Sequence, residues 1–347
     1  MSATAEAEPA APPLLEVRDL QVSFPVYAGV LRREVGRVRA VDRVSFDVRR
    51  GEVLGLVGES GSGKTTVGRA VCNLIRFGSP DAGISGEVLF EDSARRPRRR
   101  RGAPDAAGDA ALPREDPDGL PGPVLSLNPR MTVQQIVEGP LRIHGAMASG
   151  ERQARVRELL ERVGLQAAYA ERYPHEFSGG QRQRIGIARA LATHPQLVVA
   201  DEPVSALDVS VQAQVINLMS ELKREFGLTY VFIAHDLSVV HHVSDRIAVM
   251  YLGSLVEIGP ADAVRHDPRH PYTRALLSAV PQPDPRSDRS KRIRLVGDIP
   301  TPLNKPSGCG FRTRCPIAVD ACARDVPQME QVGPDHFVAC PRTGVLG

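Results

Sequence analysis

One stretch of this sequence places glycine, lysine and hydroxyl residues at the spacing of a phosphate-binding loop. Residues 58–65 read Gly-Glu-Ser-Gly-Ser-Gly-Lys-Thr and fit the pattern G-x-x-x-x-G-K-[ST] without a mismatch. The apolar run 53–57 before it indicates a buried strand, and 66–75 after it indicates a helix. Such a loop turns its backbone N–H groups toward an anion at the start of a helix. The predicted loop residues are Gly58, Glu59, Ser60, Gly61, Ser62, Gly63, Lys64, Thr65 and Thr66.

Two carboxylates follow a second apolar run and supply chemistry that the loop lacks. Residues 197–200 read Leu-Val-Val-Ala, which is typical of a buried parallel strand, and Asp201 and Glu202 come directly after them. We predict that Lys64 contacts the β- and γ-phosphates of ATP, and that Thr65 and Asp201 hold Mg²⁺. Glu202 would then polarise the attacking water. An acidic pair at a strand end can also merely cap the next helix, but the loop upstream favours the metal role.

A third stretch, Phe177-Ser-Gly-Gly-Gln181, precedes a predicted helix. The start of a helix offers N–H groups and a positive dipole end to a second anion. Alone, this pattern is equally typical of a linker or turn. Beside a phosphate loop and an Asp-Glu pair, it indicates a second phosphate-binding element.

The elements that must position these residues alternate in type, which predicts an α/β fold. Strands are expected at 15–24, 40–48, 53–57, 197–202, 229–234, 247–251 and 255–258, and helices at 133–144, 151–163, 182–193 and 209–226.

Composition excludes several classes of function. A net charge of only +3 and an aromatic content of 4% argue against a nucleic-acid partner. No apolar run approaches the roughly 18–20 residues of a membrane span, and no signal peptide precedes the first strand. We therefore expect a cytoplasmic protein that docks on a membrane protein.

The three motifs together resemble those of the ATP-binding subunits of ABC transporters, over about residues 15–260. In that family two ATPase domains pair head to tail, and each ATP lies between one phosphate loop and the signature of the other domain. The resemblance makes Glu202 the general base, His235 the switch residue that senses the γ-phosphate, and Asp208 part of the dimer-contact loop. It also places Phe24 against adenine, although a phenylalanine in a strand is more often a core residue. The signature would be Ser178, Gly179, Gly180 and Gln181.

Further segments narrow the resemblance to the oligopeptide/dipeptide importers, and to the second of their two unlike ATPase subunits. These segments are 126–132, 173–177, 208–215 and 270–277. The resemblance implies peptide import powered by ATP and Mg²⁺, a homologous partner ATPase, two membrane permeases and an external solute-binding protein. A homodimer stays open, as does another solute such as nickel. The protein would then lie at the cytoplasmic face of the cell membrane.

The implied organisation is an ABC-type P-loop ATPase core with an antiparallel β part and a helical part, followed by a small cysteine-rich extension. The expected units are a disordered tail at 1–13, a nucleotide-binding domain at 14–260 with a helical subdomain at 131–195, and an extension at 261–347.

Four of the five cysteines lie in that extension, at Cys309, Cys315, Cys322 and Cys340. A cytoplasmic compartment disfavours disulfides, and the polar neighbours are unlike a core. A four-thiolate site for zinc or an iron–sulfur cluster remains. Some peptide importers that this segment resembles carry a [4Fe–4S] cluster, so we predict the cluster rather than zinc, in a bracing role.

Residues 91–123 depart from the family pattern. Where relatives have Phe-Gln-Asp-Pro, this chain has Leu120-Pro-Gly-Pro123, and Pro121 lacks the amide of the family's glutamine. One back-translation of 115–123, shifted by one base, reads Arg-Ile-Pro-Met-Val-Phe-Gln-Asp. We therefore hypothesise that 91–123 is translated out of frame between two compensating indels. If Pro121 is genuine, the alternative is an ATP-binding scaffold or regulatory subunit with a degenerate site.

Overall fold

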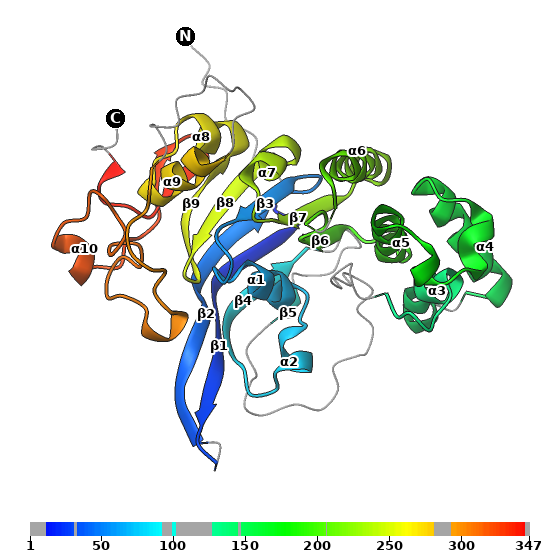
Figure 1. Cartoon of the computed structure of the whole chain (residues 1–347), viewed down its shortest axis with the longest axis horizontal. Coiled ribbons are helices and arrows are strands. Elements are labelled where there is room, and N and C mark those ends of the chain that lie inside the picture. The colour runs from blue at the N-terminus through cyan, green and yellow to red at the C-terminus, as the bar shows by residue number, and fades with distance from the viewer. Residues whose placement is uncertain are drawn as a thin grey trace, which may run out of the picture.

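The structure is a computed structural model that describes residues 12–30, 33–91, 99–101, 127–144, 147–205, 207–280 and 293–343. Pro121 and nearly all of the anomalous segment 91–123 lie outside these ranges, as does most of the predicted tail 1–13. The described residues form two sheets flanked by helices, with a separate group of helices to one side (Figure 1).

The larger sheet positions the predicted chemistry. Its order is β10-β11-β9-β8-β3-β7-β6, and its parallel centre consists of β3 (Val53–Val57), β6 (Leu197–Asp201), β7 (Thr229–Ile233) and β8 (Arg246–Tyr251). All residues of β3, β7 and β8 are buried, as expected for strands covered on both faces. Because parallel strands end at the same edge, the loop after β3 lies near the carboxylates after β6.

The smaller sheet is antiparallel, in the order β2-β1-β4-β5. It contains β1 (Leu15–Ala28), β2 (Arg33–Val48), β4 (Gly83–Phe90) and β5 (Arg99–Arg101). β1 and β2 are longer than predicted because they pair beyond their apolar portions, from Phe24↔Val38 to Ala28↔Arg33. This long hairpin extends away from the rest of the chain (Figure 1).

The helices agree with the sequence-based expectations to within a few residues. α1 (Lys64–Val71) follows the phosphate loop and leads to the short α2 (Ile75–Gly78). α3 (Val133–His144), α4 (Ser149–Arg162) and α5 (Gly179–Leu191) form the separate group in Figure 1. α6 (Val209–Phe226) and α7 (Leu237–Val243) adjoin the larger sheet.

The C-terminal segment joins the same sheet as the nucleotide-binding core. β9 (Ser254–Pro260) pairs antiparallel with β8 and leads into α8 (Ala261–His266) and α9 (Pro271–Ala279). After α10 (Ala321–Arg324), β11 (His336–Val338) pairs antiparallel with β9, and β10 (Glu330–Gly333) pairs with the outer side of β11. Among the described helices, none has the length and apolar character needed to cross a membrane.

Candidate active site

The phosphate loop has the backbone conformation that its glycines permit. Gly58 and Gly63 have φ values of 152° and 101°. A Cβ at Gly58 would lie 2.2 Å from the carbonyl oxygen of Met250, and one at Gly63 would lie 2.2 Å from that of Ala40. Larger residues are therefore excluded at both positions by backbone atoms that cannot move aside.

Lys64 lies within the loop with only 6% of its surface exposed. Its Nζ donates hydrogen bonds to the carbonyl oxygens of Gly58 and Glu59, at 2.8 and 2.9 Å, and to Ser62 Oγ at 3.2 Å. Burial lowers the pKa of the ammonium group, and the nearby carboxylates of Glu202, Asp201 and Glu59 oppose that shift. The ammonium is thus a desolvated cation at the centre of the loop.

Thr65 and Asp201 meet at the edge where β3 and β6 end. Thr65 Oγ1 donates to Asp201 Oδ1 at 3.0 Å. Burial raises the pKa of Asp201, whereas the hydrogen bond from Thr65 acts in the opposite direction. A hydroxyl beside a carboxylate in a partly buried position is a donor set that suits Mg²⁺.

Glu202 and His235 face each other next to this pair. Glu202 Oε1 lies 3.6 Å from His235 Nδ1, and the two side chains are 46% and 58% exposed. Glu202 has a positive φ of 48°, and its N–H donates to the carbonyl of Ile233 at 2.9 Å. This turn, unusual for a residue other than glycine, aims the carboxylate out of the sheet.

The Ser-Gly-Gly-Gln stretch forms a capping box at the start of α5. Gln181 N–H donates to Ser178 Oγ at 3.3 Å, and Ser178 N–H donates to Gln181 Oε1 at 3.0 Å. A Cβ at Gly180 would lie 2.5 Å from Val211 Cγ1, so α5 and α6 approach closely there. Asp208 caps α6 by accepting from Val211 N–H at 3.0 Å.

The structure therefore gathers some of the predicted residues and keeps others apart. Lys64, Thr65, Asp201, Glu202 and His235 converge at one edge of the larger sheet. Within the described part of the chain, no hydrogen bond or ion pair joins the capping box on α5 to the phosphate loop.

Phe24 lies in β1. It is partly buried and packs against the hydrophobic core that the two sheets share. Its contact with adenine stays a prediction.

Two contacts to the phosphate loop were not predicted. Tyr272 and Arg314, both from the C-terminal segment, bond to Glu59. In the sequence, Tyr272 lies in the stretch His270-Pro-Tyr-Thr, one of the segments that resemble the peptide importers.

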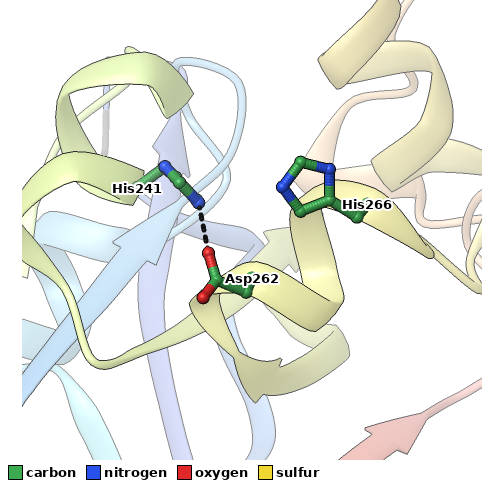
Figure 2. Close-up of side chains that lie close together, drawn as sticks. All are labelled: His241, Asp262 and His266. Carbon is green, nitrogen blue, oxygen red and sulfur yellow. Dashed lines mark hydrogen bonds and ion pairs between the residues drawn. The ribbon is translucent and has the colours of Figure 1, made fainter.

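A cluster of potential metal ligands lies elsewhere, between α7 and α8. The ligand atoms of His241, Asp262 and His266 lie within 4.8 Å of one another, the one such group of three or more among the described residues (Figure 2). His241 Nδ1 accepts from Arg265 Nη1 at 3.1 Å, so Nε2 carries the proton and donates to Asp262 Oδ1, also at 3.1 Å. With both ring nitrogens engaged and a cationic Arg265 adjacent, the cluster is satisfied as a contact between two helices.

Comparison with known proteins agrees with this geometry. Residues 41–205 match the ABC transporter family, and 256–322 match the C-terminal region of oligopeptide/dipeptide transporters. The chain is 49% identical to the oligopeptide transport ATP-binding protein AppF of Bacillus subtilis, over 94% of this chain and 96% of that one. It is 48% identical to the oligopeptide transport ATP-binding protein OppF of Salmonella typhimurium, over 96% and 97% of the two chains. The chain belongs to the ATP-binding subunits of oligopeptide ABC transporters.

Solved structures support the same fold. A dimeric ATP-binding cassette, MJ0796, in a post-hydrolysis state bound to ADP and Pi, aligns with a TM-score of 0.55 at 26% identity. It covers 71% of this chain and 98% of its own length. The α/β ABC ATPase fold predicted from the sequence is thus confirmed.

The prediction of an iron–sulfur cluster is wrong on these comparisons, because the matched family is that of ABC transporters and the relatives are transport ATP-binding proteins, with no cluster indicated. Burial raises the pKa of the thiols of Cys309, Cys315 and Cys340, the last to about 11. Cys322 and Cys340 are buried, and Cys309 and Cys315 pack against the larger hydrophobic core.

Zinc does not fit the same cysteines. Tetrahedral bonds of about 2.3 Å require sulfurs about 3.8 Å apart. No three of the four described sulfurs, those of Cys309, Cys315, Cys322 and Cys340, lie within 4.8 Å of one another.

Proposed function

We propose that this protein binds and hydrolyses ATP to power the import of oligopeptides or dipeptides. It would act at the cytoplasmic face of the cell membrane, with two permeases and an external solute-binding protein. The relatives named as oligopeptide transport ATP-binding proteins support the solute class. The observation that carries the ATPase assignment is the meeting of Thr65 with Asp201 beside Glu202 and His235.

Each residue has a distinct part in this proposal. The ammonium group of Lys64 would exchange its three hydrogen-bond acceptors in the loop for oxygens of the β- and γ-phosphates. The loop therefore already holds this ammonium group where the phosphates would bind. Thr65 and Asp201 fit Mg²⁺, which would supply charge neutralisation for the phosphates when bound. Partial burial raises the pKa of Asp201, so a cation beside it would stabilise the carboxylate.

Hydrolysis would use Glu202 as general base. Its carboxylate is half exposed and projects from a strained turn, so a water molecule can approach it. It would accept a proton as the water attacks the γ-phosphate, while His235, at 3.6 Å, orients the carboxylate and contacts the phosphate. Both side chains come from the ends of adjacent parallel strands, which fixes their relative position.

A second ATPase domain completes the site in this proposal. The capping box of α5 presents free N–H groups of its first turn, but it makes no bond to the loop of its own chain in the described residues. We infer that Ser178 and Gly180 face the ATP of a homologous partner, in a heterodimer or a homodimer. The dimeric cassette MJ0796 supports this arrangement.

The test is Glu202→Gln in the assembled transporter, with Glu221→Gln on the exposed face of α6 as the matched control. Loss of a general base lowers turnover by about 10²–10⁴-fold. We expect ATP to bind the Glu202→Gln variant normally while its hydrolysis falls by that factor, and the Glu221→Gln control to retain full turnover. Unchanged turnover with Glu202→Gln would refute the assignment and favour the scaffold alternative that Pro121 raises.

A further inference from the structure

Among the described residues, the hydrogen bonds from the C-terminal segment to the phosphate loop converge on Glu59. The backbone N–H of Glu59 donates to Tyr272 Oη at 2.9 Å. Arg314 Nη1 donates to Glu59 Oε2 at 3.0 Å. The carbonyl of Glu59 accepts from Lys64 Nζ at 2.9 Å. Glu59 is thus held by its N–H and its carboxylate from the C-terminal segment, and by its carbonyl from the loop lysine.

These contacts are built into the interior. Tyr272 is fully buried, and the Arg314 side chain is 8% exposed. Tyr272, Tyr251 and Phe311 pack against one another with ring centroids 4.7 to 5.4 Å apart. Arg314 follows Phe311 by one turn, in which its N–H donates to the Phe311 carbonyl at 3.0 Å. The aromatic packing therefore fixes the position from which Arg314 reaches the loop.

Glu59 needs such a partner because of where its charge lies. Its carboxylate is close enough to Lys64 to act on the pKa of that ammonium group, in the direction that raises it. The phosphates of ATP would bind to the same ammonium group of Lys64. An unpaired carboxylate there would repel them, in a partly buried setting where charges are poorly screened.

We propose that Arg314 and Tyr272 are positioning residues for ATP binding: Arg314 neutralises and holds Glu59, while Tyr272 fixes its backbone. The C-terminal segment thereby sets the phosphate loop for nucleotide. This role rests on the proposed ATPase function, and it gives the segment a direct part in the affinity of the site.

The test measures equilibrium binding of MgATP to the purified full chain, all variants being compared in the Glu202→Gln background to prevent turnover. Arg314→Gln should weaken binding about tenfold, the effect of losing a charge-assisted hydrogen bond. Arg312→Gln is the matched control, because Arg312 bonds only within the segment, to Ser307. It should leave binding unchanged.

A second variant distinguishes neutralisation of the Glu59 charge from a purely structural role of Arg314. Glu59→Gln added to Arg314→Gln removes the uncompensated carboxylate, so binding should return to within about twofold of the parent. Tyr272→Phe, which deletes only the hydroxyl, should weaken binding by about three- to tenfold.

Three results would overturn the proposal. These are unchanged affinity in Arg314→Gln, failure of Glu59→Gln to restore it, and a lowered melting temperature with unchanged affinity. Arg314→Lys, which keeps the charge, serves if Arg314→Gln does not fold, and affinity near that of the parent is then expected. Because binding is measured without turnover, a failure of the ATPase assignment would appear separately, as wild-type chains that bind MgATP but do not hydrolyse it.

Discussion

Acidification should destabilise this protein through one buried histidine. His270 is 1% exposed, and its ring packs 5.7 Å from that of Phe311. Its Nδ1 accepts the N–H of Tyr272 at 3.1 Å, which caps α9. Glu257, also buried, accepts the N–H of His270 at 2.9 Å and lies 2.8 Å from His336 Nε2.

The pKa of His270 sets the direction and size of the effect. Burial lowers this pKa from 6.5 to about 4, against the opposing influence of Glu257. Between these values His270 is protonated in the unfolded chain and neutral in the folded one. Its contribution to stability is therefore complete above pH 6.5 and is lost as the pH falls toward 4. The full loss corresponds to about 3 kcal/mol, of which about 2 kcal/mol falls between roughly pH 7 and pH 5.

The assay is urea unfolding of the wild-type chain and of His270→Asn across that pH range. Asparagine keeps a capping acceptor but does not titrate, and both chains share every other titrating group. The stability of the wild type relative to the variant should thus decrease by about 2 kcal/mol on acidification. A relative stability that stays constant from pH 7 to pH 5 would refute the argument.

Three other predictions concern the nucleotide site. Thr65→Val keeps the shape of the side chain but removes the hydroxyl group that bonds to Asp201. We expect Mg²⁺-dependent ATP hydrolysis by this variant to fall about 10²-fold. Its affinity for the nucleotide, measured by titration, should be the same with Mg²⁺ as in the control with EDTA. Gly180→Ala would place a methyl group 2.5 Å from Val211 Cγ1; ATP-dependent dimerisation should weaken, and Val211→Ala should restore it, as measured by light scattering. The gene across codons 91–123 should read Met-Val-Phe-Gln-Asp-Pro in the shifted frame; fresh genomic sequence without it would refute the out-of-frame hypothesis.

The chemistry of the site could be predicted from the sequence because each part of it is local. Residues 58–65, 178–181 and 201–202 are short stretches whose function depends on backbone geometry within a few residues. The strands and helices around them follow from hydrophobic periodicity, which also reflects neighbours along the chain. The convergence of 58–65 and 201–202 at one edge follows from their place after parallel strands.

Tertiary structure decided what depends on residues distant in sequence. The polar ends of β1 and β2 form strands only because they pair with each other. The sequence did not show that Cys322 and Cys340 are buried, because burial is a property of the folded chain. Glu59 and Arg314 are 255 residues apart, and no spacing pattern connects them. They come into contact because β11 pairs with β9 and Phe311 packs against Tyr272. This packing places the C-terminal segment beside the phosphate loop, which the sequence alone did not indicate.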